Sequence, residues 1–254
     1  MPPAQTTVDV APRCLMSPDR DFGWCKCIAV PDRSRDGERV GTGNAPAAAD
    51  TAAPPERQVR AAFDRDHLTV YQAFRPDIAE AAVAAGTFVA PFSLDRMTWI
   101  KPSFTWMMYR SGWATKPGQE RVLAVRVARS AFDRALAASC VSHFDPHLHE
   151  SHTHWQEQIR RTQVRVQWDP ERTLDLTRLP WRTIQVGLSG VAAAAYVHEW
   201  ITGVTDVTDL AHAVHRLVES GDVHGARALL PVEAAYPLPP DAAAAVGADV
   251  TGGG

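Results

Sequence analysis

The stretch HLTVYQAFRPDIAEAAVAAG, residues 67–86, decides the fold class of this chain. Its first eight residues are rich in β-branched and aromatic side chains, which is typical of a β-strand. Pro76 suits the first turn of a helix, because that turn leaves its amide hydrogens unpaired, and Gly86 suits a helix C-cap, because glycine tolerates a left-handed backbone. The stretch therefore predicts a strand followed directly by a helix.

The same mixture of elements continues along the chain. Further strands are predicted at 121–128, 163–168 and 182–188, and further helices at 102–112, from a Ser130–Asp133 capping box to about Cys140, at 190–202 and at 208–220. In 163–168 the apolar Val164, Val166 and Trp168 alternate with polar residues, as expected for a strand with one buried face. This interleaving predicts a single α+β domain with a mixed or antiparallel sheet and flanking helices.

Composition sets the expected boundaries of that domain. Residues 1–56 and 233–254 are rich in proline, alanine and glycine, and such segments bury too little apolar surface to offset their ordering entropy. We therefore expect disordered tails on either side of a globular domain at 57–232. In the whole chain of 254 residues, 45% are hydrophobic and 22% are charged, which is enough for a sizeable core.

Other global features exclude several classes of protein. The formal net charge of -3 gives no sign of overall basicity, and four cysteines are too few for a disulfide scaffold. No apolar stretch reaches the length of about 18 residues that a membrane helix requires. The N-terminus also lacks the pattern of a secretory signal. We expect a cytoplasmic protein without a membrane partner. The sequence gives no basis for predicting the oligomeric state.

The chemically unusual stretch is RMTWIKPSFTWMMYRSGW, residues 96–113, which combines five aromatic residues with Arg96, Lys101 and Arg110. A helix over 102–112 brings Trp106, Tyr109 and Arg110 within one turn of each other. Flat aromatic rings beside fixed cations suit a ligand that carries both rings and phosphates. The alternative is that the aromatic side chains fill the core while the cations face solvent.

A second candidate stretch is QWDPER, residues 167–172, where a strand is expected to give way to a turn. Carboxylates at the end of a strand often act in active sites, and Asp169 or Glu171 can serve there as a general base or bind ribose. The alternative is a structural turn, in which Asp169 accepts backbone hydrogen bonds and Glu171 pairs with a neighbouring arginine. Both interpretations stay open.

Half of the histidines lie in SHFDPHLHESHTHW, residues 142–155. The spacing of His147, His149, His152 and His154 is compatible with zinc or nickel. It matches no closed structural zinc site, and no cysteine pair accompanies it. We therefore interpret the segment as a polar, exposed connection and predict no metal site.

Four blocks of the chain resemble a family of bacterial and eukaryotic proteins catalogued as domain of unknown function 4291. The blocks are VYQAFRPDIAEAAVAAGTF, RMTWIKPSFTWMMYRSGWATKPGQERVLAV, VRVQWDPER and RTIQVGL. The resemblance covers residues 57–218, nearly the whole expected domain. It implies membership of the family but little chemistry.

The rhythm of VYQAF followed by a helix and a glycine is also similar to the start of ADP-ribosyltransferases. That resemblance implies NAD as the cofactor, with Tyr71 and Gln72 standing where those enzymes carry Tyr-His. It further implies that Ser103 or Tyr109 contacts nicotinamide. Those enzymes also carry a Glu or Gln on a strand late in the chain, which orients ribose and stabilises positive charge at the anomeric carbon. The resemblance implies that Gln167 or Glu171 occupies this position. Gln72 departs from the His or Arg of that group.

These observations support two leading hypotheses of function. The first is an NAD- or nucleotide-dependent transferase, with nucleic acid among its acceptors, and the second is a non-catalytic module that binds RNA or single-stranded DNA. A purely structural or partner-binding protein is the third. The candidate catalytic residues are Gln72, Gln167 and Glu171, and the candidate cofactor-binding residues are Tyr71, Arg96, Lys101, Ser103, Trp106, Tyr109 and Arg110.

Overall fold

Strand β2 (His67–Phe74) and helix α1 (Pro76–Ala85) lie where the opening stretch predicts them. Helix α1 begins at Pro76 and ends at Gly86, whose left-handed backbone (φ 69°) lets its N–H reach the carbonyl of Val83. The computed structural model describes residues 54–249, so the predicted disorder of residues 1–53 and 250–254 lies outside the described residues. The described residues belong to one folded unit.

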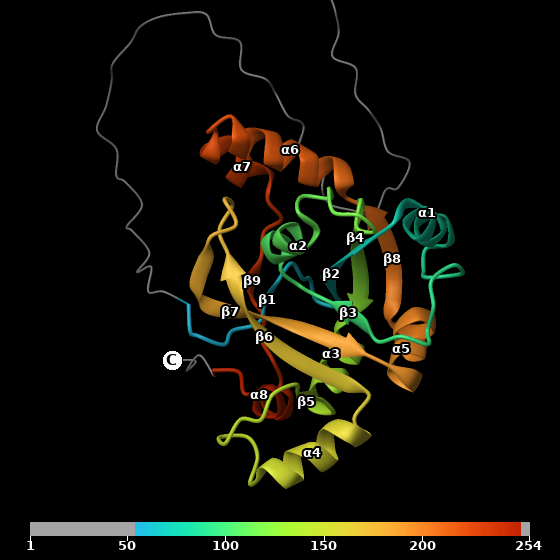
Figure 1. Ribbon diagram of the computed structural model, residues 1–254, viewed down its shortest axis with the longest axis vertical. Helices are drawn as coiled ribbons and strands as arrows, with labels where there is room; N and C mark the ends of the chain where they lie inside the picture. The colour runs from blue at the N-terminus through green and yellow to red at the C-terminus, as the bar shows by residue number, and fades with distance from the viewer. Residues whose placement is uncertain (1–53, 250–254) are drawn as a thin grey trace, which may run out of the picture. The chain divides into compact units, whose positions relative to one another are not determined.

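The remaining elements confirm an α+β domain (Figure 1). The strands are β1 (Arg60–Ala61), β3 (Thr98–Ile100), β4 (Arg121–Ala128), β5 (Cys140–Val141), β6 (Val164–Arg172), β7 (Arg178–Leu188), β8 (Ile201–Asp206) and β9 (Ala234–Ala235). The helices are α2 (Phe104–Ser111), α3 (Arg129–Ala137), α4 (His152–Arg161), α5 (Gly190–Ala195) with a π-helical turn η1 (Tyr196–Trp200), α6 (Thr208–Glu219), α7 (Val223–Leu229) and α8 (Pro240–Val246).

Two larger sheets form the centre of the domain. One has the order β2-β4-β8 and is antiparallel, and the other has the order β3-β7-β6-β5, in which only β5 runs parallel to its neighbour. A bridge between Tyr71 and Lys101 joins β2 to the end of β3, with the Tyr71 N–H donating to the Lys101 carbonyl at 2.6 Å. The four-stranded sheet is therefore mixed and the three-stranded sheet antiparallel, in agreement with the predicted mixed or antiparallel sheet.

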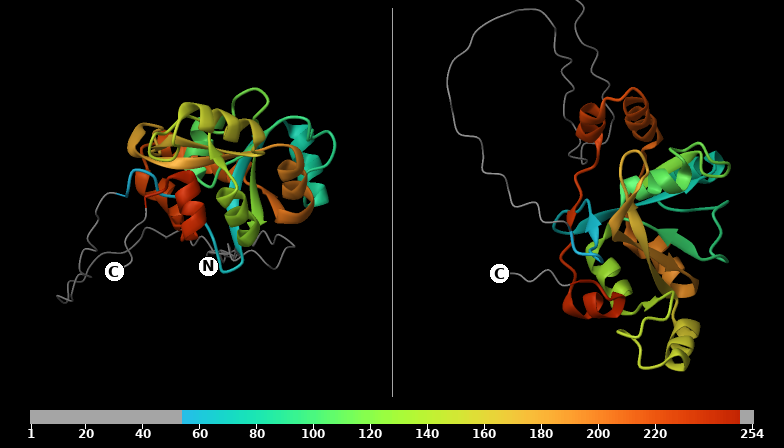
Figure 2. Two further views of the ribbon diagram at one scale, coloured as in Figure 1. Left: turned by 90° about the horizontal axis from the view of Figure 1, so that it is seen from below. Right: turned by 60° about the vertical axis from the view of Figure 1, so that its left-hand side comes forward.

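Two hydrophobic clusters hold these layers together. The larger one contains the inward residues of β4, β6 and β7, including Val125, Val166 and Val186, which are all fully buried. The smaller one surrounds α2 and joins it to α6 and α7. Figure 2 shows α6 and α7 together at one end of the described unit and α4 at the other.

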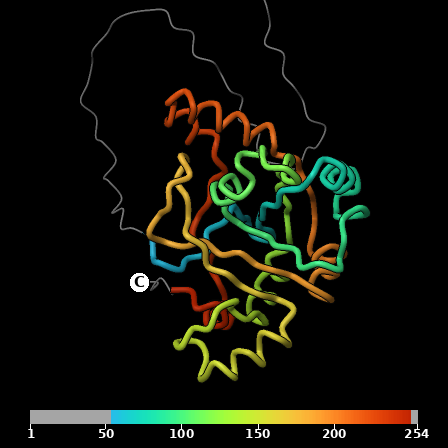
Figure 3. Tube along the Cα trace, in the orientation of Figure 1, coloured from blue at the N-terminus to red at the C-terminus, as the bar shows by residue number. Residues whose placement is uncertain are grey.

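The predicted disordered tail at 233–254 is wrong for residues 233–249. Strand β9 pairs with β1, and α8 packs against α3 (Figure 3). Tyr236 is only 5% exposed and contacts the rings of Phe63 and Phe132. The composition misleads because the alanines of α8, although weakly apolar, permit close helix packing, while Tyr236 and Val246 supply the buried surface.

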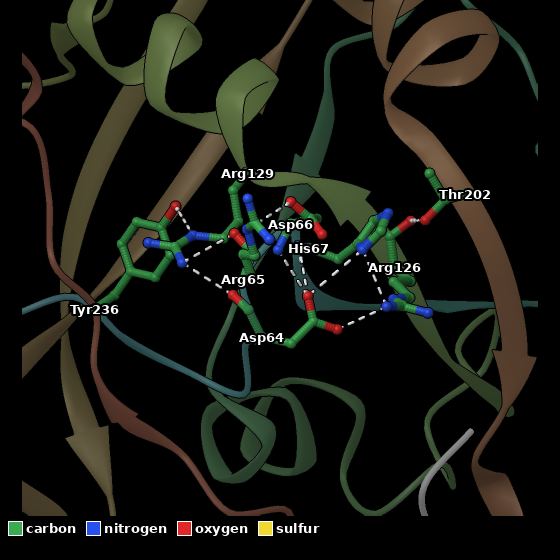
Figure 4. Close-up of polar contacts among 8 residues, drawn as sticks. All are labelled: Asp64, Arg65, Asp66, His67, Arg126, Arg129, Thr202 and Tyr236. Carbon is green, nitrogen blue, oxygen red and sulfur yellow. Dashed lines mark hydrogen bonds and ion pairs between the residues drawn. The ribbon is translucent and has the colours of Figure 1, made fainter. Parts of the chain in front are cut away.

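A polar network also connects this C-terminal segment to the turn between β1 and β2 (Figure 4). Arg129 donates to the carbonyl of Asp64 at 2.9 Å and to the hydroxyl of Tyr236 at 3.2 Å. The Asp64 carboxylate accepts from the backbone N–H of His67 at 2.8 Å and from Arg126 at 2.6 Å. The start and the end of the described chain are therefore tied to the same elements.

The structure corrects three further predictions. The helix predicted at 190–202 ends at Trp200, and its last two residues belong to β8, whose β-branched residues pair with β4. The Ser130–Asp133 capping box is absent: α3 has no side-chain cap, and Asp133 instead accepts from the Tyr236 hydroxyl at 2.7 Å. The connection predicted to be polar and exposed includes the start of α4, which has no buried residue, but His149 within it is buried.

The turn predicted around Asp169, Pro170 and Glu171 is also wrong, because all three residues lie within β6. Strand β5 pairs only with Arg165 and Val166, so β6 has one free edge by the time it reaches Pro170. A proline is tolerated at such an edge because no partner needs its missing N–H. The pairing with β7 becomes irregular only between Pro170 and Arg172.

Candidate functional site

One face of the four-stranded sheet is polar, although the opposite face belongs to the core. Along β6 the side chains of Gln167, Asp169 and Glu171 point away from the core that Val164 and Val166 help to form. In the register with β7, Gln167 stands opposite Gln185 and Asp169 opposite Thr183. The Gln185 amide donates to Gln167 Oε1 at 3.0 Å, so β6 and β7 are linked across this face.

Lys101 crosses the polar face from the end of β3. Its Nζ lies 2.8 Å from Asp169 Oδ2 and 3.4 Å from the centre of the Trp106 ring, and the residue is 1% exposed. Burial lowers the pKa of the Lys101 ammonium group from 10.5 to about 7, against the opposing effect of the Asp169 carboxylate. The amine is therefore close to its titration point at neutral pH.

The start of α2 is held by two carboxylates from distant parts of the chain. Ser103 caps the helix by accepting from the Trp106 N–H at 3.2 Å, and its hydroxyl donates to Glu171 Oε1 at 2.9 Å. The Phe104 N–H donates to Glu233 Oε1 at 2.7 Å. Negative charge is favoured at a helix N-terminus, but burial still raises the pKa of the Glu233 carboxyl from 4.5 to about 8.

The aromatic residues of α2 sit between two cations. The Trp106 and Tyr109 rings meet edge to face at 6.5 Å, and Lys101 lies against the far side of Trp106. The Arg172 guanidinium lies 3.6 Å from the centre of the Tyr109 ring. Tyr109 remains 39% exposed, so part of its side chain is accessible to solvent although Arg172 lies against the ring.

A cleft of about 540 Å³ opens beside this polar face, where β2, β3, β7 and α2 meet. We call it the arginine cleft, because Arg75, Arg96 and Arg110 line it. Its aromatic walls include Phe92, Trp99 and Trp106, and its amides include Gln72, Gln119 and Gln185. No aspartate or glutamate is among the residues of the described chain that line it.

The three arginines differ in how firmly they are held. Arg110 donates to Gln119 Oε1 at 3.0 Å, and Arg75 pairs with Asp77 at 2.6 Å outside the cleft. Within residues 54–249, the structure shows no ion pair for the exposed side chain of Arg96. Arginine guanidinium groups match the geometry of phosphate oxygens, so the cleft is suited to an anionic ligand.

Gln72 forms part of the cleft floor and is itself fully engaged. Its Nε2 donates to Thr98 Oγ1 at 2.8 Å and to the Trp99 carbonyl at 3.1 Å, while its Oε1 accepts from the Tyr196 hydroxyl at 2.7 Å. The residue is 2% exposed. These bonds fix β2 to β3 directly under the cleft.

The structure brings four of the ten predicted site residues to the arginine cleft, namely Gln72, Arg96, Trp106 and Arg110. Lys101, Ser103 and Glu171 lie behind Trp106, and Gln167 reaches the cleft through Gln185. The remaining two are outside it: Tyr71 is buried against Phe104, and Tyr109 stacks with Arg172.

Several residues that line the cleft were not among the predicted site residues, including Arg75, Trp99 and Gln185. The alternation of RTIQVGL does place Gln185 on the face opposite to Ile184 and Val186, which was a usable signal. Trp99 lies within the predicted aromatic stretch, but only the structure shows that its ring rests on Gly187, where a Cβ would come within 2.9 Å.

The histidine segment is built differently. His149 is buried, with its Nδ1 3.1 Å from the Asp145 carbonyl and its Nε2 3.8 Å from the Cys140 thiol. His152 packs against Trp155 on α4. Among the residues that the structure describes, no three histidine, cysteine or acidic side chains converge as metal ligands do.

Together these features define a class, an α+β domain with an acid-free, arginine-lined cleft where two sheets join. Residues 58–236 match the family described as domain of unknown function (DUF4291), and the chain belongs to that family. A comparison with curated proteins gives no match. Within residues 54–249, no helix combines the length and apolar character needed to cross a membrane.

Proposed function

We propose that the protein binds a nucleotide in the arginine cleft. The observation that carries this proposal is the combination of three arginines and two tryptophans around one acid-free space. Guanidinium groups recognise phosphate, and indole rings stack on a base. Because no carboxylate lines the cleft, an anionic ligand meets no negatively charged side chain on its walls.

The size of the cleft favours a single nucleotide over a nucleic-acid strand. Pockets for small molecules and cofactors usually enclose about 300–1,000 Å³, and the volume of about 540 Å³ falls within that range. A single strand needs a groove that follows the backbone over several nucleotides. Tight binding of an oligonucleotide without binding of mononucleotides would support the nucleic-acid alternative instead.

Transfer of a group from NAD is the second candidate function. The contact between Ser103 Oγ and Glu171 Oε1 at 2.9 Å favours it, because the ADP-ribosyltransferase resemblance implies Ser103 or Tyr109 at one position and Gln167 or Glu171 at the other. In such a reaction Glu171 stabilises the positive charge that develops at the anomeric carbon. The prediction is release of nicotinamide from NAD, and its loss in Glu171→Gln while the protein stays folded.

The binding proposal is tested by calorimetric titration with AMP, ATP, NAD, inorganic phosphate and adenosine. We expect the phosphorylated ligands to bind and adenosine to bind much more weakly. Loss of a charge-assisted hydrogen bond costs about 1.5–3 kcal/mol, so Arg96→Ala and Arg110→Ala should each weaken binding by about 10- to 100-fold. Affinity should also fall as the salt concentration rises.

Arg65→Ala is the matched control. Its side chain is 94% exposed and lies in the turn between β1 and β2, and it does not line the cleft. This variant should bind each ligand like the unaltered protein. Equal affinity for adenosine and AMP, or equal weakening by Arg65→Ala and Arg96→Ala, would contradict a phosphate site in the arginine cleft.

A further inference from the structure

Trp106 connects the arginine cleft with a buried charge. One of its neighbours is the cleft, which it helps to line, and another is the Lys101 ammonium group, 3.4 Å from the centre of its ring. Its backbone is fixed by the Ser103 cap at the start of α2, so the position of the ring depends on what it packs against. Lys101 is therefore separated from the cleft by one aromatic side chain.

The Lys101 ammonium group also contacts strand β6 of the four-stranded sheet. Asp169 contacts its Nζ at 2.8 Å, and the two residues are 68 positions apart in the chain. A cation over an indole ring is attracted by the negative face of the ring, and the attraction is larger where water is excluded. Lys101 is 1% exposed, so this condition is met.

We propose that Lys101 is a positioning residue: its ammonium group, anchored on Asp169, holds the Trp106 ring in place as a wall of the arginine cleft. The affinity of the cleft for an anionic ligand then depends on the charge of this buried amine. The proposal rests on the proposed function, since it concerns the same ligand. It gives Lys101 an indirect role, in which it touches Trp106 rather than a phosphate.

The surroundings of Lys101 determine how it titrates. From β6, the Asp169 and Glu171 carboxylates favour its charged form, whereas Arg172 and burial oppose it. Burial has the largest effect and lowers the pKa of the ammonium group to about 7.

Apart from Glu233, the other elements of residues 54–249 that surround the amine bring no further charge that changes near neutral pH. β7 offers the uncharged Thr183 and Gln185 to the polar face, and α2 presents Trp106. Burial raises the pKa of the Tyr71 phenol on β2 well above 10, so this side chain stays neutral. Glu233, which lies near Glu171, is the exception, with a carboxyl pKa of about 8.

Raising the pH through about 7 therefore removes the charge from Lys101. Its attraction to the Trp106 ring weakens, and one positive charge next to the cleft is lost. Both changes act in the same direction, so binding of an anion is strongest in mild acid. We expect the dissociation constant to rise several-fold between pH 6 and pH 8, around a midpoint set by this pKa.

NAD is a suitable probe for this test, because its pyrophosphate keeps the same charge over that range. The full chain is titrated with NAD by calorimetry at intervals of pH. Lys101→Arg should bind equally well throughout, because a guanidinium group does not lose its proton in proteins. Asp169→Asn removes the carboxylate that favours the charged amine, so it should move the midpoint to lower pH.

Glu233→Gln is the control for the other titrating group. It keeps an oxygen that can accept from the Phe104 N–H, and it should leave the pH profile unchanged. A flat profile in the unaltered protein, or the same profile in Lys101→Arg, would overturn the positioning role. If Lys101→Arg does not fold, the shift expected for Asp169→Asn decides the same point.

A measurement without ligand separates this inference from the proposed function. The indole N–H resonance of Trp106, assigned with a Trp106→Phe variant, should shift with pH around a midpoint near 7 and should stay constant in Lys101→Arg. If the Trp106 resonance does not shift with pH, the contact between Lys101 and Trp106 does not depend on the charge of the amine, and the inference is refuted. A titrating resonance without binding of any nucleotide refutes the proposed function and leaves the Lys101–Trp106 coupling in place.

Discussion

Replacing Gln72 by methionine should destabilise the protein strongly, because the amide holds three buried partners. Its loss leaves Thr98 Oγ1, the Trp99 carbonyl and the Tyr196 hydroxyl without their bonds of 2.8, 3.1 and 2.7 Å. Each buried polar group that loses its partner costs about 1–3 kcal/mol. Hydroxyl groups can rotate toward other acceptors, so we use the lower end, which gives a total of about 3 kcal/mol.

The assay is urea unfolding followed by circular dichroism, together with a thermal melt. For a domain of this size, 1 kcal/mol corresponds to about 2–4 °C, so the melting temperature should fall by about 6–12 °C. Tyr196→Phe removes only one of the three bonds and should cost less. The double variant should cost less than the sum of the two, because both changes break the same contact.

Gln156→Met is the matched control, since Gln156 lies on α4 and is only half-buried. It should change the free energy of unfolding by no more than about 0.5 kcal/mol. If Gln72→Met were as stable as this control, the three bonds would carry no net stabilisation, and the reasoning from buried polar groups would fail here. Loss of nicotinamide release from NAD with unchanged stability would instead favour the catalytic role predicted for Gln72.

Three other predictions concern the walls of the cleft and its supports. Gly187→Ala places a Cβ 2.7 Å from Met97 Sδ and 2.9 Å from the Trp99 ring. It should lower the free energy of unfolding, measured in urea, by about 1–3 kcal/mol, and it should weaken nucleotide binding. Unchanged binding would mean that Trp99 does not contact the ligand. Ser103→Ala removes the N-cap of α2 and should lower the free energy of unfolding by about 1 kcal/mol, which a thermal melt detects as a lower melting temperature. An unchanged melting temperature would mean that Glu171 and Glu233 cap the helix without the Ser103 hydroxyl. The pKa of the Glu233 carboxyl is raised from 4.5 to about 8, so between these values the folded state binds more protons than the unfolded chain. The free energy of unfolding should therefore decline as the pH rises from about 4.5 to about 8. Glu233→Gln should reduce that decline, and an equal dependence of stability on pH in both proteins would contradict the prediction.

Local signals explain the parts of the fold that were predictable. The strand and helix at 67–85, the strand at 121–128 and the end of the helix predicted at 102–112 all depend on residues adjacent in the chain. The alternation in QVRVQW also placed Gln167 and Trp168 on opposite faces correctly. Proline at position 170 misled, because whether it breaks a strand depends on which edge is paired, and that is a property of the whole sheet.

The candidate site was predictable only as a set of residue types. The aromatic and basic stretch does supply Arg96, Trp106 and Arg110 to one cleft, as the helical spacing favoured. Arg75 comes from the end of β2, and its arrival beside them follows from sheet pairing. The pairing of Lys101 with Asp169 likewise requires β3, β7 and β6 to lie side by side, which no local pattern encodes.

The tie between the two ends of the described chain has a consequence for biosynthesis. Arg57 donates its N–H to the Asp249 carboxylate at 2.9 Å, and the Asp249 N–H donates back to the Arg57 carbonyl at 2.8 Å, over a separation of 192 residues. Closing so long a loop is entropically costly and comes late in folding. On the ribosome, β1 must therefore wait for β9 and α8 to emerge, so a chain that still lacks them exposes the apolar surface that Tyr236 and Val246 later cover.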